Sequence, residues 1–372
     1  MKKSLWVLLG VVPLFLVWGC SLKTQPTSGG QVQAMTAPPS GSTWQLLPNY
    51  PVTVHANEPS LFVYNGTPYV AYQDGSNSNK LSVMSYNGSY WSLVGAPDFT
   101  PGAANNPSLF VYGGKPYVAF QDAANSNKGA VMTYTGTSWA YVGGGDFSPA
   151  QADSPSLSIF KGRLYVAFVD YSIGQKATVM VSSGGAWSYL SGANAGISPG
   201  IAADTTLAMN LGTPYVAFQD IPNGTKATVM TFNGAGWVNV GNPDFSQTTA
   251  ANLVLSVSSG IPYVAFMDPS CNGESAMSYT GGSWGYVGNQ CGASVPAVPS
   301  LFVYNGTPYL AFTDGLQYVT VNTYQGGWGP VGTADFGGPA VQGPSLFVYN
   351  GTPYVAFSNS AVGNALMVMA YM

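Results

Sequence analysis

One tyrosine recurs seven times at nearly constant spacing, and this repetition constrains the fold more than any other feature of the chain. It lies in a segment of the type Pro-Tyr-Val-Ala-Phe, and successive copies are between 45 and 50 residues apart. The seven copies are Tyr69, Tyr117, Tyr165, Tyr215, Tyr263, Tyr309 and Tyr354. Repeats of this length arise when a chain stacks copies of one small unit, because each copy buries its apolar faces against its neighbours.

Each repeat contains four segments with the composition of short β-strands. In the first repeat they are residues 60–64, 68–73, 81–86 and 91–94. These segments are rich in β-branched and aromatic residues, and tight-turn sequences such as Asn65-Gly66 separate them. The 47 glycines and 27 prolines supply the turns that many short strands require. Seven such units predict an all-β fold, a seven-bladed β-propeller of four-stranded antiparallel blades.

Seven tryptophans show how the ring of blades closes. They occupy the fourth-strand position and are Trp44, Trp91, Trp139, Trp187, Trp237, Trp284 and Trp328. Trp44 precedes any complete repeat, whereas the last repeat reaches Met372 after only three strands. We therefore expect residues 43–48 to complete the last blade as its outer strand, which leaves no unpaired strand edge at the chain ends.

The repeats, over residues 43–372, resemble those of uncharacterised bacterial secreted and lipoprotein β-propellers. Signatures of better-known propellers are missing from the sequence: the Trp-Asp pair of WD40 repeats, the Ser-x-Asp-x-Gly-x-x-Trp box of sialidase-like propellers and the Gly-Gly doublet that ends the second strand of kelch repeats. The resemblance implies the fold and carries no particular activity, since one fold supports many functions.

The N-terminal twenty residues differ in character from the repeats. Lys2 and Lys3 precede an apolar run over residues 5–17, which is the layout of a secretory signal and is short for a membrane span. We predict that residues 1–20 are a signal peptide and that the protein is exported.

The end of this segment, Val-Trp-Gly-Cys, resembles the lipobox of bacterial lipoproteins, in which the cysteine is diacylated. Trp18 departs from the small residue that is usual there, so an ordinary signal peptide with a chance cysteine stays as the alternative. The resemblance implies lipidation of Cys20, a membrane anchor, and a location at the outer membrane or cell surface. Residues 21–42 have the composition of a flexible tether.

Charged residues are few, and the acidic ones fall at equivalent places in the repeats. Only 6% of residues are charged and the net charge is −4, so the chain lacks the clustered lysine and arginine that binding to nucleic acid needs. Six aspartates directly follow a second strand: Asp74, Asp122, Asp170, Asp220, Asp268 and Asp314. Loops after the second and fourth strands share one rim of a propeller, and we expect all 14 acidic side chains on that rim.

Two interpretations of this acidic rim stay open. In the first interpretation, each aspartate caps its own loop by accepting backbone hydrogen bonds, and in four repeats a lysine six residues later supports it. These lysines are Lys80, Lys128, Lys176 and Lys226. Alternatively, the carboxylates and neighbouring asparagine and tyrosine side chains bind glycan hydroxyl groups or calcium, the one cofactor that this pattern suggests.

Two cysteines interrupt only the fifth repeat. Cys271 and Cys291 lie in two loops of the same rim, and export permits oxidation, so we predict a disulfide bond between them. A zinc site is disfavoured, because neither cysteine has a Cys-x-x-Cys partner and the single histidine is far away in the sequence. No metal site is predicted from these residues.

Missing residue types disfavour several activities. His55, the single histidine, leaves one candidate for a Ser-His-Asp triad and is better explained as a loop residue. Sialidase chemistry on propellers resembles a clamp of three arginines, whereas Arg163 is the one arginine of the chain. Glycoside hydrolysis needs two carboxylates with different pKa values, and near-identical repeats place the aspartates in equivalent surroundings.

The sequence therefore favours a noncatalytic cell-surface lipoprotein whose propeller binds another protein or acts as a scaffold. A multivalent carbohydrate-binding lectin, using exposed tryptophan, tyrosine and aspartate side chains, is the first alternative. A glycan-active hydrolase is a minor one. The expected partners are a protein or glycan at the cell surface and the membrane itself, reached through the lipid on Cys20, with no role for nucleic acid.

Overall fold

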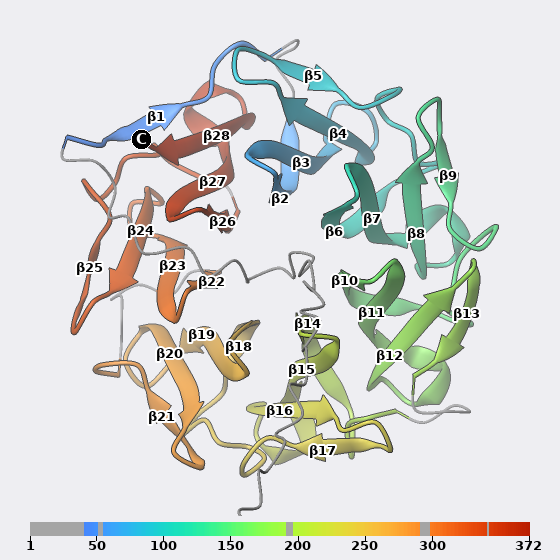
Figure 1. The fold of residues 1–372 in the computed structure, drawn as a ribbon, viewed down its shortest axis with the longest axis vertical. Helices are drawn as coiled ribbons and strands as arrows, with labels where there is room; N and C mark the ends of the chain where they lie inside the picture. The colour runs from blue at the N-terminus through green and yellow to red at the C-terminus, as the bar shows by residue number, and fades with distance from the viewer. Residues whose placement is uncertain (1–40, 51–54, 191–195, 291–297, 341) are drawn as a thin grey trace, which may run out of the picture.

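The chain forms a ring of seven four-stranded antiparallel sheets around a common axis (Figure 1). The computed structural model describes residues 41–50, 55–190, 196–290, 298–340 and 342–372. In each sheet the strands follow one another from the axis outward, and the last sheet takes its outermost strand from the beginning of the chain. The predicted seven-bladed β-propeller is confirmed.

The strands are numbered along the chain, and the blades follow the same order. The innermost strands are β2 (Ala56–Tyr64), β6 (Ala104–Tyr112), β10 (Ala152–Phe160), β14 (Ala202–Asn210), β18 (Ala251–Ser258), β22 (Ser300–Tyr304) and β26 (Ser345–Tyr349). The second strands are β3 (Thr67–Asp74), β7 (Lys115–Asp122), β11 (Arg163–Asp170), β15 (Thr213–Asp220), β19 (Ile261–Asp268), β23 (Thr307–Thr313) and β27 (Thr352–Asn359).

The outer half of each blade is built in the same way. The third strands are β4 (Lys80–Tyr86), β8 (Lys128–Tyr134), β12 (Lys176–Ser183), β16 (Lys226–Phe232), β20 (Gly273–Thr280), β24 (Val319–Tyr324) and β28 (Ala365–Tyr371). The outermost strands are β5 (Trp91–Leu93), β9 (Trp139–Tyr141), β13 (Ala186–Tyr189), β17 (Trp237–Asn239), β21 (Ser283–Tyr286), β25 (Trp328–Pro330) and β1 (Trp44–Leu46). Four short 3-10 helices follow second strands: η1 (Ala123–Asn125), η2 (Tyr171–Ile173), η3 (Ile221–Asn223) and η4 (Ser360–Val362).

The two ends of the ring differ in their connections. The loops between second and third strands, and the connections from one blade to the next, lie at one end, which we call the loop face. The tight turns between the first and second strands and between the third and fourth strands lie at the other end, the hairpin face. Every acidic residue within the described ranges belongs to the loop face by its position in this topology.

In blades 1 to 5 the innermost strand is longer than the sequence predicts, because a β-bulge extends it toward the loop face. β2 begins at Ala56 rather than at residue 60, and its pairing with β3 shifts between Asn57 and Ser60. Glu58, inside the bulge, adopts a positive φ of 47°. Its carboxylate accepts a hydrogen bond of 2.6 Å from the amide of Asn106 in the next blade. The bulge therefore turns a side chain sideways to join two blades.

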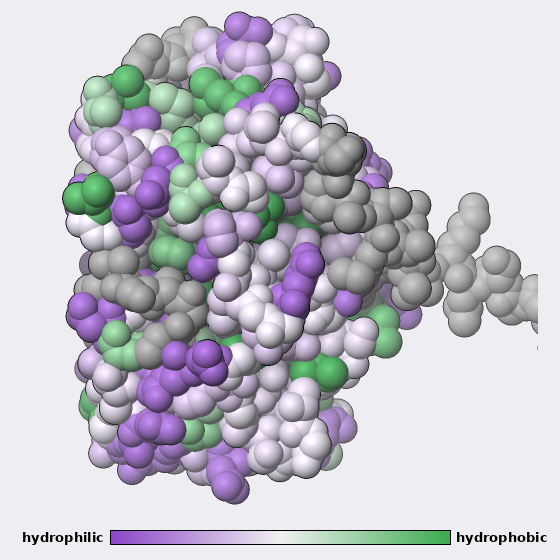
Figure 2. Space-filling model, turned by 90° about the vertical axis from the view of Figure 1, so that its left-hand side faces the viewer, coloured by the Kyte–Doolittle hydropathy of each residue, from purple (hydrophilic) through white to green (hydrophobic). Residues whose placement is uncertain are grey.

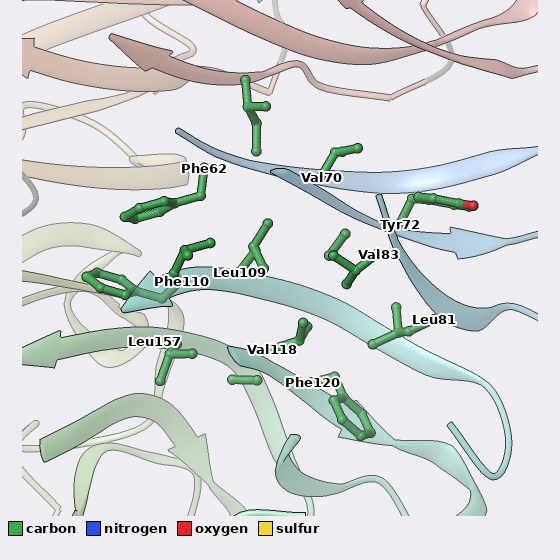
Figure 3. Close-up of a cluster of buried hydrophobic side chains, with 14 of the residues drawn as sticks. Phe62, Val70, Tyr72, Leu81, Val83, Leu109, Phe110, Val118, Phe120 and Leu157 are labelled. Carbon is green, nitrogen blue, oxygen red and sulfur yellow. The ribbon is translucent and has the colours of Figure 1, made fainter. Parts of the chain in front are cut away.

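The blades pack face to face through apolar side chains. Val70 of blade 1 and Val118 and Phe120 of blade 2 are completely buried, and Figure 3 shows them in the layer between the two sheets. The rings of Phe62 and Phe110, on neighbouring innermost strands, have centroids 4.7 Å apart. Both surfaces of a blade are covered by a neighbour, which explains why the second strands are continuously apolar.

The repeated tryptophans hold neighbouring blades together at the outer edge. The Nε1 of Trp139 donates a hydrogen bond of 2.8 Å to the carbonyl of Val94 in the preceding blade. Its ring stacks on Phe99 of that blade, with centroids 4.0 Å apart and planes 8° from parallel. The same bond from Nε1 to a carbonyl of the preceding blade is made by Trp44, Trp91, Trp187, Trp284 and Trp328.

The ring closes as the tryptophan count predicts. β1 pairs with β28, with Trp44 opposite Tyr371. The amide of Thr43 donates to the carbonyl of Met372 at 2.8 Å, and the amide of Met372 donates back to Thr43 at 3.1 Å. The Trp44 ring stacks on Phe336 of blade 6 at 3.9 Å, so the N-terminal strand is fixed both to its own sheet and to the neighbouring blade.

The outer wall of the ring is of mixed polarity. Figure 2 shows apolar residues scattered among polar ones on the side of the ring that it displays. Within the described ranges, no helix is both long and apolar enough to cross a membrane. The predicted signal peptide, the lipidation site Cys20 and almost all of the predicted tether fall in residues 1–40, outside the described residues.

Candidate functional site

The six aspartates that the sequence singles out form a ring on the loop face, one in each of the first six blades. Five of them end a second strand, and Asp314 directly follows β23. Asn359 holds the equivalent place in blade 7. Asp122, Asp170, Asp220 and Asp268 are at most 2% exposed, whereas Asp74 and Asp314 are half-buried.

Most of these carboxylates cap the loop that they begin. In five blades, Oδ1 accepts a hydrogen bond from the backbone amide two residues further on, at 2.8 to 3.0 Å. The pairs are Asp74 with Ser76, Asp122 with Ala124, Asp170 with Ser172, Asp268 with Ser270 and Asp314 with Leu316. Asn359 accepts from Ala361 in the same way, which shows that an amide oxygen fills the role equally.

Oδ2 also accepts a hydrogen bond in all four buried members, and in two of them the donor is a tyrosine hydroxyl at 2.8 or 2.9 Å. The hydroxyl of Tyr141 donates to Oδ2 of Asp122 at 2.9 Å, and that of Tyr189 donates to Oδ2 of Asp170 at 2.8 Å. Burial and this bond to Asp170 raise the pKa of Tyr189, so the hydroxyl stays a donor. A ligand at these positions would have to displace internal hydrogen bonds, and the geometry therefore favours loop capping over a ring of equivalent binding sites.

The expected lysines stand opposite the aspartates in the strand register. Asp122 is paired with Lys128 and Asp220 with Lys226, but the hydrogen bonds to these carboxylates come from amide and hydroxyl groups. Lys226 instead acts on Asp244, in the connection after blade 4. Burial and the nearby Asp220 raise the pKa of Asp244, and Lys226 opposes that rise.

Asp220 differs from the other members of the ring. The residue two positions further on is Pro222, which has no amide proton to donate. Oδ2 accepts from the side chain of Asn223 at 3.0 Å, and Oδ1 is buried without a partner among the described residues. An unpaired buried oxygen is costly, so Asp220 contributes less to its loop than its equivalents do.

This difference predicts unequal effects of truncation. We expect Asp170→Ala to lower the free energy of unfolding by about 1–3 kcal/mol, because the amide and hydroxyl of Ser172 and the hydroxyl of Tyr189 lose their acceptor. Asp220→Ala should lower the free energy of unfolding by less than half as much, since it removes one hydrogen bond and one unpaired oxygen. Urea denaturation of both variants tests this, and equal losses would contradict the capping role.

The remaining candidate residues do not assemble a metal or triad site. Within the described ranges, no three side chains of histidine, cysteine, aspartate or glutamate converge. His55 lies at the junction of blades 1 and 7, with its Nε2 2.5 Å from the side-chain nitrogen of Asn364. Arg163 lies over Tyr165 near the hairpin face, away from the acidic residues.

The predicted disulfide concerns one described and one undescribed residue. Cys271 is half-buried in the loop after β19, and its Sγ is 3.8 Å from the hydroxyl oxygen of Ser275. Cys291 lies outside the described residues, so the disulfide stays a prediction.

A hollow of about 610 Å³ opens on the loop face at the inner ends of blades 2, 3 and 4. Its exposed side chains are Asn106 of β6, Tyr171 of η2, Ile221 of η3 and Ile201, which precedes β14. Asp153 of β10 and Asp204 of β14 add two carboxylates to the lining. Unlike the aspartate ring, this combination of residues occurs once in the molecule.

Sequence reasoning missed this hollow, although the repeats contain a signal for it. The residue after each loop aspartate, or after Asn359, varies along the chain: Gly75, Ala123, Tyr171, Ile221, Pro269, Gly315 and Ser360. Large apolar side chains stand there only in the third and fourth repeats. Comparison of this position among the seven repeats indicates Tyr171 and Ile221 as the residues that differ.

Comparison with known proteins identifies the fold and nothing more specific. The chain matches no protein-family model and no curated protein sequence. Among solved structures, it resembles the PL25 polysaccharide lyase ulvan lyase, with a TM-score of 0.54 and 13% identity over 87% of this chain and 95% of that chain. It also resembles AofleA from Arthrobotrys oligospora, with a TM-score of 0.51 and 11% identity over 79% and 90% of the two chains. Both neighbours support the propeller architecture.

Proposed function

We propose that this protein is a noncatalytic binding module, displayed at the cell surface, whose propeller holds a protein partner on its loop face. The supporting observation is how the repeated polar and aromatic side chains are used. The loop aspartates cap their own loops, and six tryptophans join neighbouring blades. Exposed side chains that occur once therefore remain as the candidates for contact with a partner.

This use of the repeated residues disfavours the two glycan-directed alternatives. A multivalent lectin would present the same side chains in several blades, yet the tryptophan rings are stacked between blades. A hydrolase needs two carboxylates with separated pKa values on either side of a substrate. Polysaccharide lyase activity in a fold neighbour at 13% identity does not carry over to this chain.

The signal-like segment at residues 1–20 and the lipobox-like cysteine support export and anchoring, and we include both in the proposal. Cys20 would carry the lipid, and residues 21–42 would link it to the ring. The membrane would be the outer membrane or the outer face of the cell, as the sequence leads us to expect.

The proposal is tested by binding the soluble form, residues 21–372, to cells that lack the gene. We expect saturable binding that is lost after the cells are treated with protease and kept after their glycans are oxidised with periodate. A glycan array, with and without calcium, should stay blank. Binding that periodate abolishes and protease spares would establish a lectin instead, and the absence of saturable binding would refute the proposal.

A further inference from the structure

We propose that the hollow between blades 2, 3 and 4 is the docking site for a partner segment in which aliphatic residues flank a lysine or arginine. This inference rests on the proposed function and names the chemistry of the partner. The hollow is distinct from the predicted aspartate ring, and its volume lies within the range of about 300–1,000 Å³ that is usual for ligand sites.

The apolar part of the hollow is exposed in a way that no fold requirement explains. Tyr171, Ile201 and Ile221 are 38%, 43% and 37% exposed, respectively. Ile201 and Ile221 are adjacent, because the amide of Ile221 donates to the carbonyl of Ile201 at 3.1 Å. In blade 2, the pair at the same backbone contact is Ala103 and Ala123. Blade 4 therefore has isoleucines at two positions where blade 2 forms the same backbone contact with alanines.

The polar part of the hollow carries negative charge without a cation. Asp153 accepts hydrogen bonds from Gln121 at 2.6 Å, Gln151 at 3.0 Å and the hydroxyl of Tyr171 at 2.7 Å, which are all neutral donors. Asp204 accepts from the amide of Asn252 at 2.7 Å. Burial raises the pKa of Asp204, as expected for a carboxylate without a positive neighbour.

The nearest lysine along the chain is not part of the lining of the hollow. The lining of the hollow contains no lysine or arginine among the described residues. Lys176 follows Gln175 of the lining, but its aliphatic carbons lie against Gly196, in the connection after blade 3. A cationic group from a partner is therefore the natural complement to Asp153 and Asp204.

The lining favours a peptide over a sugar. Sugar rings bind on flat aromatic faces, whereas here two of the four exposed side chains of the lining are isoleucines and the hydroxyl of the single tyrosine is already bonded to Asp153. Aliphatic side chains of a partner would bury Ile201 and Ile221, and an adjacent lysine or arginine would face the two carboxylates. Acidic glycans would be repelled by the same carboxylates.

The test uses the soluble form, residues 21–372, and three fluorescent six-residue peptides of alternating composition. We expect the leucine–arginine peptide to bind, and the serine–arginine and leucine–glutamate peptides to bind at least tenfold more weakly in fluorescence anisotropy at physiological salt. The double variant Ile201→Ser, Ile221→Ser should weaken the leucine–arginine peptide at least tenfold. The matched control is Leu211→Ser, which changes a side chain 75% exposed on the hairpin face and should leave binding unchanged.

Each outcome decides the inference separately from the proposed function. Equal binding of serine–arginine and leucine–arginine peptides would indicate a merely acidic surface and overturn it, as would full binding by the double variant. A glycan-array signal that the double variant loses would reassign the hollow to a sugar.

In the cell assay, protease-sensitive binding that survives in the double variant would place the partner elsewhere on the protein. The absence of cell binding by the unchanged protein would refute the proposed function itself. Equal melting temperatures of all variants confirm that folding is intact.

Discussion

Removing β1 should destabilise the whole ring, although the strand is only three residues long. A form beginning at residue 48 loses the pairing with β28, the Trp44 bond to Val331 and the stack on Phe336. Trp44 is half-buried, so its loss alone accounts for part of the cost of about 3–5 kcal/mol that truncation of a fully buried tryptophan carries. We expect the melting temperature to fall by about 10 °C or more relative to a form beginning at residue 43, measured by circular dichroism.

Two controls separate this effect from loss of the preceding residues. Forms beginning at residues 21 and 43 should melt at the same temperature, because residues 21–42 precede the closing strand. Gln45→Ala changes an exposed side chain of β1 and should have little effect, whereas Trp44→Ala should reproduce most of the loss. A synthetic peptide of residues 42–50, added to the shortened form, should restore part of the stability. If the shortened form melts like the others, the pairing of β1 does not close the ring.

The second large effect is expected at Asp268, and it should depend on pH. Burial alone would raise the pKa of Asp268, but hydrogen bonds from Ser270, Gln290 and Thr248 outweigh burial and lower it. At neutral pH, Asp268→Asn should lower the free energy of unfolding by about 3 kcal/mol, because an amide nitrogen then meets groups that themselves donate.

The sign of the pH dependence follows from the lowered pKa. The ionised carboxylate is stabilised in the folded state, so its contribution is complete above the pKa of the unfolded chain. That contribution is lost as the pH falls through the lower pKa of the folded state. The difference in the free energy of unfolding between Asp268→Asn and the unchanged protein should therefore be smaller at pH 3 than at pH 7, as measured by urea denaturation.

Asp74→Asn is the matched control for this experiment. Asp74 accepts the same loop amide but is half-buried, and Asn359 shows that an amide oxygen caps such a loop. We expect a change of less than about 1 kcal/mol at both pH values. A constant loss at Asp268 across the pH range would mean that its charge does not contribute to stability.

The sequence predicts the architecture well because two different residue types each mark the number of blades independently. Seven tyrosines mark the second strands and seven tryptophans mark the fourth, and the displaced Trp44 indicates which end of the chain completes the last blade. The bulge at Glu58 was not predicted. It depends on a positive φ at a residue other than glycine, and the alternation of apolar and polar residues carries no sign of that.

The candidate site was less predictable for a different reason. The position of the aspartate ring follows from topology, but whether a carboxylate faces a ligand or its own loop depends on the conformation of the next two residues. Pro222 after Asp220 was visible in the sequence, and it marks the one loop that cannot be capped by the usual amide. The hollow combines residues from three repeats, so no single repeat reveals it.

The pairing of the chain ends also sets an order on folding. β1 is synthesised before every other strand of the ring and its partner β28 after all of them, so the contact between Trp44 and Tyr371 spans the whole ring. Six blades can assemble from neighbouring segments as they emerge, whereas the seventh cannot be completed before β28 is synthesised. Until then the first strand has an unpaired backbone, and the growing ring is an open arc with two exposed blade faces. Completion of the last seven-residue strand thus converts a chain of locally folded blades into one cooperative unit.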